Sequence, residues 1–170
     1  LVDVDGDGTD EMVLGTDDGY VHAVDADGID LPGFPVRTPP AAYWHSESLA
    51  AQDFGIIGPG EAIPVGSPAV ADLDGDGLSE IVVTDLGGNV SWWDSTGRLK
   101  GQVSTDPRFS RQENTDRWNR VKRGIAGSAA VDDLDGDGTL EVVVAAMDRH
   151  VYAWHADGRR VDGFPVLAVD

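Results

Sequence analysis

The sequence predicts an all-β fold in which units of four short antiparallel strands repeat as the blades of a β-propeller. Three features of the chain indicate this. An Asp- and Gly-rich segment occurs at residues 3–11, 72–80 and 133–141, and these segments are named the first, second and third acidic loops. Each loop is followed by a short apolar run typical of a buried strand. The similarity continues past the loops at offsets of 69 and 61 residues, and such repeats are typical of propellers and solenoids.

The second unit shows the expected strands most clearly. An inner strand over 68–71 enters the second acidic loop, and a buried strand over 80–84 leaves it. A Gly-rich turn leads to an aromatic strand over 89–94, and another Gly turn leads to an outer strand near 99–103. Because four antiparallel strands make one propeller blade, each unit is predicted to be a blade with its acidic loop between the first and second strands.

The units divide the chain into five parts. We predict a partial blade over 1–36, an insert over 37–65, a blade over 66–103, a basic insert over 104–126, and a blade over 127–170 that includes the start of the next. This organisation corresponds to about two and a half to three blades, whereas a closed propeller has at least about four. The partners expected are therefore the remaining blades of a larger chain, of which this is a fragment, or other copies of this chain.

Composition excludes several classes of function. The formal net charge of −19 argues against nucleic acid as a partner, because phosphates are repelled. The chain has no cysteine, which excludes disulfides and thiolate metal sites. No apolar run approaches the ~20 residues of a membrane span, so none is predicted.

The acidic loops have the pattern of a cation site. Each carries carboxylates at positions one, three, five and nine, with glycines at four and six. Alternating Asp side chains in a tight Gly-rich turn converge, and they repel one another unless a hard cation lies between them. Calcium takes six to eight oxygen ligands, so the loops predict calcium sites, with a solvated acidic turn as the alternative.

These loops are not EF-hands. An EF-hand needs a bidentate Glu at its twelfth position and helices on both sides. The twelfth positions here are Leu14, Val83 and Val144, and strand-like runs follow the loops. We therefore predict strand-loop-strand sites.

The segment Gly66-Ser-Pro-Ala-Val-Ala-Asp-Leu-Asp-Gly-Asp-Gly77, with Glu80-Ile-Val-Val83 after it, resembles the FG-GAP or VCBS repeat. That repeat builds the calcium-binding propeller of integrin α-subunits and of many secreted bacterial proteins. The resemblance covers nearly the whole chain apart from the two inserts. It departs from the family in lacking the literal Phe-Gly…Gly-Ala-Pro signature and in having Glu at the ninth loop position.

The resemblance implies up to three Ca²⁺ ions, an extracellular or cell-surface location, and a role in adhesion or in ligand or protein binding. It assigns side-chain ligands to the first, third, fifth and ninth loop positions: Asp3, Asp5, Asp7 and Glu11; Asp72, Asp74, Asp76 and Glu80; Asp133, Asp135, Asp137 and Glu141. It assigns backbone carbonyl ligands to the seventh position: Thr9, Leu78 and Thr139.

The inserts are predicted to lie on the face opposite the acidic loops, because strand direction alternates within a blade. The first carries aromatic residues and a histidine: Tyr43, Trp44, His45 and Phe54. The second carries two aromatics and a basic cluster: Phe109, Trp118, Arg108, Arg111, Arg117, Arg120, Lys122 and Arg123. Such a cluster can bind a carboxylated glycan or an acidic protein, or it can pair with the acidic scaffold, and both alternatives stay open.

No catalytic constellation is found, so the chain is not predicted to be an enzyme. The close carboxylate sets are accounted for by the acidic loops. The alternative function is the propeller part of a secreted polysaccharide-degrading enzyme of the pectin-lyase type, or a scaffold attached to a catalytic domain. Trp92, Trp93 and Trp154 are predicted to pack between blades, and His22, His150 and His155 to be ordinary strand residues.

Overall fold

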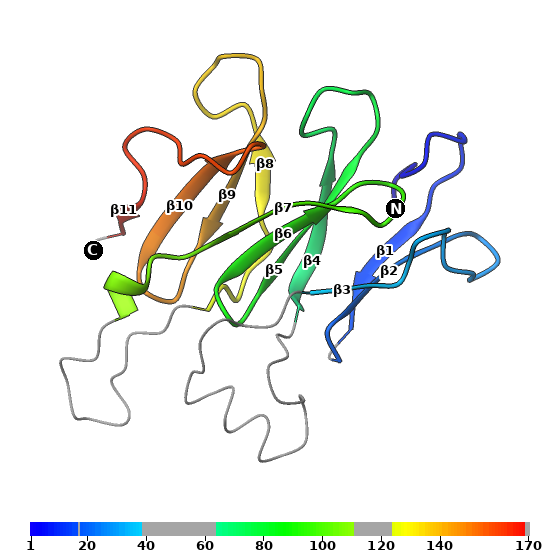
Figure 1. The fold of residues 1–170 in the computed structure, drawn as a ribbon, viewed down its shortest axis with the longest axis horizontal. Helices are drawn as coiled ribbons and strands as arrows, with labels where there is room; N and C mark the ends of the chain where they lie inside the picture. Colours follow the sequence, from blue (N-terminus) through cyan, green and yellow to red (C-terminus); the bar gives the residue numbers. More distant parts are fainter. Residues whose placement is uncertain (17, 39–63, 111–123, 169–170) are drawn as a thin grey trace.

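Three antiparallel sheets follow one another along the chain in the computed structural model, which describes residues 1–16, 18–38, 64–110 and 124–168 (Figure 1). The first sheet contains β1 (Met12–Gly15), β2 (Tyr20–Val24) and β3 (Val36–Arg37). The second contains β4 (Pro64–Ala71), β5 (Glu80–Asp85), β6 (Asn89–Trp93) and β7 (Leu99–Ser104). The third contains β8 (Ala130–Asp132), β9 (Glu141–Ala145), β10 (His150–His155) and β11 (Val166–Leu167).

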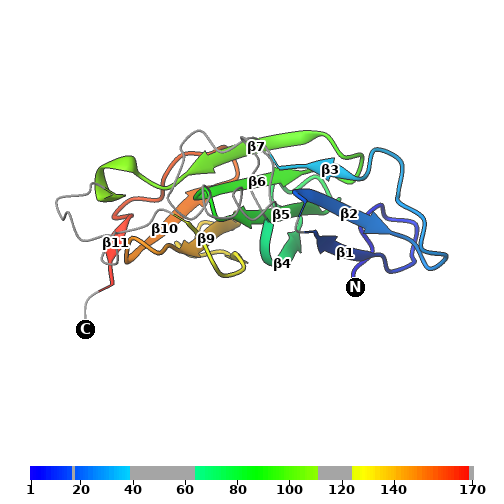
Figure 2. The same cartoon turned by 90° about the horizontal axis from the view of Figure 1, so that it is seen from below.

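Each complete sheet has the strand order of a blade. The second runs β4-β5-β6-β7 and the third β8-β9-β10-β11, with every neighbouring pair antiparallel. The view from below shows the sheets in a row, in chain order (Figure 2). A 3-10 helix, η1 (Pro107–Ser110), follows β7, and no helix in the described ranges is long and apolar enough to cross a membrane.

The predicted strands of the second unit agree with the observed ones to within a few residues. The strands extend into the range expected for the first insert, because Arg37 pairs with Tyr20 in β2 and residues 64 and 65 pair with β5. At the C-terminal end, the segment expected to start a next blade instead contains β11. Val166 pairs with Val151, so β11 is the fourth strand of the third sheet, and β3 pairs in the same way with β2 as the last strand of the three-stranded first sheet.

The core lies between the sheets. Trp93 of β6 and Ile81 of β5 share one buried cluster with Val21 of the first sheet, whereas Trp92 shares another with Trp154 of the third. Consecutive strand residues point to opposite faces, so the central blade contributes to both clusters, and every residue of β5 and β6 is buried. The predicted packing of the three tryptophans between blades is confirmed, since each is at most 3% exposed.

The second and third acidic loops lie at one end of the sheets, at the top of Figure 1. The turn between β5 and β6 and the helix η1 lie at the opposite end. Within η1, the guanidinium of Arg108 bonds to the carboxylate of Asp106 at 2.6 Å, and the ring of Phe109 stacks on His150 at 3.9 Å. Because Asp106 lies within the insert predicted over 104–126, this bond does not test whether the basic cluster pairs with the acidic blades.

The rest of the predicted binding face lies outside the described residues. This applies to the following side chains: Tyr43, Trp44, His45, Phe54, Arg111, Arg117, Trp118, Arg120, Lys122 and Arg123.

Candidate metal centre

The first Asp of each acidic loop holds the loop in shape. In the second loop, Oδ1 of Asp72 accepts the N–H of Gly75 at 2.8 Å, and Oδ2 accepts that of Gly77 at 2.9 Å. Gly75 and Gly77 have φ values of +76° and +90°, in the left-handed region that side chains disfavour. Asp3 and Asp133 make the equivalent bonds in the first and third loops.

The ninth-position Glu ties the end of each loop to its beginning. Oε2 of Glu80 accepts the N–H of Leu73 at 2.9 Å, and Glu11 and Glu141 accept the equivalent N–H groups at 2.9 and 2.8 Å. All three Glu side chains lie in the interior, with Glu80 only 1% exposed. Each loop thus places one carboxylate in a buried position directly under exposed ones.

The structure brings together some of the predicted ligands but not all. In the first two loops, carboxylate oxygens from positions one, three and nine lie within 4.8 Å of one another: Asp3, Asp5 and Glu11, then Asp72, Asp74 and Glu80. Asp7 and Asp76 belong to neither group, and their Oδ1 atoms accept the N–H groups of Thr9 and Leu78 at 2.7 and 2.9 Å. The carbonyls assigned to Thr9, Leu78 and Thr139 stay a prediction.

The second loop fits a hard cation. Oε1 of Glu80 is buried and has no hydrogen-bond partner among the described residues, and the Glu80 carboxylate belongs to one close group with Asp72 and Asp74. Burial raises the pKa of the Glu80 carboxyl, and the negative charges of Asp74 and Asp76 raise it further. A buried oxygen without a partner is costly, and an oxygen-only donor set is what calcium prefers.

A lysine already offsets part of the charge of the second loop. Nζ of Lys100 in β7 lies 2.7 Å from Oδ2 of Asp74. The hydrogen bond to Asp74 raises the pKa of this lysine. Because both side chains are about one-third exposed, solvent screens this pair, and a divalent ion has much of the charge still to neutralise.

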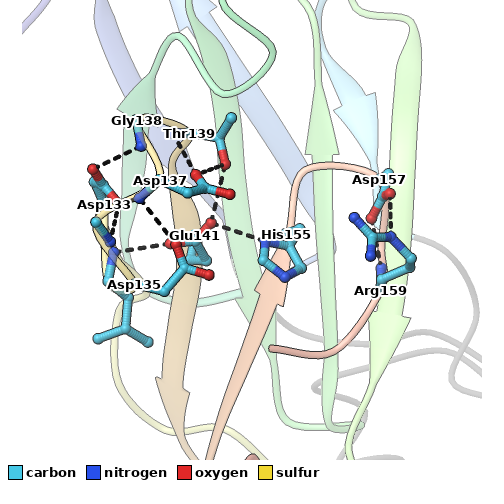
Figure 3. Close-up of polar contacts among 11 residues, drawn as sticks. Asp133, Asp135, Asp137, Gly138, Thr139, Glu141, His155, Asp157 and Arg159 are labelled. Carbon is cyan, nitrogen blue, oxygen red and sulfur yellow. Dashed lines mark hydrogen bonds and ion pairs between the residues drawn. The ribbon is translucent and has the colours of Figure 1, made fainter. Parts of the chain in front are cut away.

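The third loop differs from the other two (Figure 3). Asp133, Asp135 and Asp137 form one close group, and Asp135, Glu141 and His155 form another. Nδ1 of His155 lies 3.0 Å from Oε1 of Glu141. Sequence reasoning missed this contact by treating His155 as an ordinary strand residue. The strand register would have indicated this contact, because His155 in β10 pairs directly with Glu141 in β9.

Comparison with known proteins supports the fold and the repeat. Residues 72–144 match the family model of the FG-GAP-like repeat. No curated protein matches the chain. Among solved structures, BBS1N in complex with ARL6DN is similar at a TM-score of 0.57 and 12% identity, covering 94% of this chain and 40% of that one. BamB from Moraxella catarrhalis is similar at a TM-score of 0.53 and 12% identity, covering 89% of this chain and 36% of that one.

Both neighbours are β-propeller-like, and at this identity they show the fold alone. The chain spans about two-fifths of their length. The predicted all-β architecture of partial-propeller blades is confirmed, and the match to the FG-GAP-like repeat over residues 72–144 agrees with the repeat found in the sequence.

Proposed function

We propose that this chain is a calcium-stabilised β-propeller module that acts in adhesion or in the binding of a ligand or protein, outside the cell or on its surface. The observation that carries the calcium assignment is the buried Glu80 carboxylate, which has an unpartnered Oε1 and belongs to one close group with Asp72 and Asp74. The first loop repeats the same three-carboxylate group with Asp3, Asp5 and Glu11. Up to three Ca²⁺ ions are proposed, one for each acidic loop.

The role proposed for calcium is structural. Each acidic loop joins strands of one blade, and its buried Glu begins or immediately precedes the second strand. An ion held there offsets the mutual repulsion of the carboxylates and ties the loop to that strand. Binding only to the folded state, it stabilises the blade by mass action.

The proposed module binds rather than catalyses. An FG-GAP-like repeat and propeller-like neighbours fit a structural or binding protein, and neighbours more than twice as long as this chain point to other blades or other copies as partners. Loops on a rigid scaffold are suited to recognition, so the ligand is proposed to contact the end of the sheets that carries the inserts.

The calcium assignment is tested by thermal unfolding of the chain in chelator and in calcium, with bound calcium counted by equilibrium dialysis. We expect a higher melting temperature in calcium and release of the ions in chelator. A melting curve indifferent to both conditions would refute calcium stabilisation.

The binding assignment is tested by a glycan array and an acidic-peptide array, followed by a product assay on every glycan that binds. Binding without turnover supports a binding module. Turnover of an anionic polysaccharide would overturn it in favour of a polysaccharide-degrading enzyme.

A further inference from the structure

The third acidic loop contains a nitrogen donor that the other two loops lack. Nδ1 of His155 lies 3.0 Å from Oε1 of Glu141, and the two residues form a group with Asp135 in which one ligand atom from each lies within 4.8 Å of the others (Figure 3). The Glu141 side chain is fully buried, and that of His155 is 17% exposed. An imidazole and two carboxylates from three different positions therefore converge at the boundary between core and solvent.

The position of His155 explains why only this blade has the imidazole. The repeat offsets align His155 with Asp25 and Asp94 of the other two blades. Those two carboxylates accept backbone N–H groups of the turns that follow them. In the third blade Asp157 instead accepts a backbone N–H of this turn, that of Arg159, through its Oδ1 at 2.9 Å. The side chain of residue 155 is thereby released from the turn and faces the acidic loop.

We propose that the third acidic loop holds a transition-type divalent cation, for which Zn²⁺ is the probe, between Asp135, Glu141 and His155. This inference rests on the proposed function, because it assigns the ion at one of its three loops. Calcium takes oxygen ligands, whereas imidazole nitrogen suits zinc and its neighbours in the first transition row. Zinc accepts both His nitrogen and carboxylate oxygen, and sites with three protein ligands leave a fourth position for water.

The surroundings of the group support an ion site. Oε2 of Glu141 accepts the N–H of Leu134 at 2.8 Å, which fixes the carboxylate and leaves Oε1 facing the imidazole. A cleft of about 390 Å³, lined by His155, Asp137, Arg159 and residues of the second loop, opens beside it. An ion can enter through this cleft, and a water molecule has room to complete its coordination.

Two cations compete for this loop under the proposal. Asp135 belongs both to the mixed group and to the oxygen-only group with Asp133 and Asp137. Calcium on the oxygen-only group and zinc on the mixed group would share one carboxylate, so they cannot both bind fully. Competition between the two ions therefore reports which group is used.

The test is a calorimetric titration of Zn²⁺ into the chain in the presence of excess Ca²⁺, with Co²⁺ absorption as a spectroscopic signature of nitrogen ligation. We expect one equivalent of Zn²⁺ for the unmodified chain. His155→Asp, which introduces the residue found at this position in the other blades, should lose that site and bind one calcium ion more than the zinc-loaded unmodified chain. His22→Gln is the matched control, because His22 also lies 3.0 Å from a carboxylate oxygen, that of Asp30, but belongs to no multi-ligand group among the described residues.

Zinc binding that is equal in the unmodified chain and in His155→Asp, or that stoichiometric calcium abolishes, would overturn the zinc assignment. A cobalt spectrum unchanged by His155→Gln would do the same. These results leave the calcium response of the first two loops untouched. Conversely, failure of calcium to stabilise the chain would refute the proposed function while the zinc titration could still be read.

Discussion

Replacing Glu80 with Gln separates the charge of the second acidic loop from its shape. The amide keeps the size of the side chain and an oxygen that can accept the N–H of Leu73, which the carboxylate accepts at 2.9 Å. It removes the buried negative charge that lies beside Asp72 and Asp74. We expect one calcium site to be lost without loss of the fold.

The structure gives the size and sign of the effect. At the 4.8 Å limit between ligand oxygens, each like-charge pair costs about 0.9 kcal/mol at a water-like dielectric and about 3.5 kcal/mol at an effective dielectric of 20. The exposed, Lys100-paired Asp74 belongs near the lower value. Without calcium, Glu80→Gln should therefore be at least as stable as the unmodified chain. With calcium at 100 times its Kd, the variant should lack about 2.7 kcal/mol of stabilisation.

For a chain of this length, that free energy corresponds to about 5–11 °C in Tm. The assay is thermal unfolding followed by circular dichroism, in chelator and in calcium, with Asp27→Asn as the control. Asp27 is exposed in the turn after β2 and belongs to none of the carboxylate groups. If Glu80→Gln keeps the full calcium response, or loses as much stability in chelator as in calcium, the reasoning is wrong.

Three further substitutions test the packing and the buried polar groups. Burial raises the pKa of Asp85 to about 6 from 3.8, so the folded state binds the Asp85 proton more tightly than the unfolded state does. The free energy of unfolding should therefore fall by about 3 kcal/mol as pH rises from about 4 to above 6. Asp85→Asn should flatten this pH profile, measured in chelator. Gly101→Ala places a Cβ 2.2 Å from the buried ring of Trp92, so urea unfolding should show a loss of about 1–3 kcal/mol. Tyr152→Phe removes the 2.6 Å hydrogen bond to Asp148 and should cost about 1–3 kcal/mol in the same assay.

Each of these predictions has its own contradicting result. A pH profile of stability that is the same for Asp85→Asn and the unmodified chain would show that Asp85 does not titrate in this range. Gly127→Ala is the control for overpacking, since a Cβ there meets no atom within 4 Å. Equal unfolding midpoints for the two alanine variants, or for Tyr152→Phe and the unmodified chain, would contradict the corresponding structural argument.

Local patterns in the sequence were sufficient for the elements of the central blade. The short apolar, β-branched run within 80–84 predicted β5, and the glycines on either side predicted the turns, because these preferences act over a few residues. The same holds for the acidic loops. Asp72, Gly75 and Gly77 shape the second loop through hydrogen bonds that span only three to five positions.

The C-terminal strand could not be predicted in this way. Residues 166–167 carry no local signal that separates the fourth strand of one blade from the first strand of the next. Only their pairing with β10, across a turn and a long connection, decides between the two.

By itself, the sequence determined the repeat, the strand order of a blade and the positions of the acidic side chains, since all of these follow from spacing along the chain. The tertiary structure alone decided two features of the site: one oxygen of Glu80 is buried without a partner, and His155 faces Glu141. These outcomes depend on strand register and on packing between sheets. Both bring together groups that are distant in sequence, and no local preference encodes that distance.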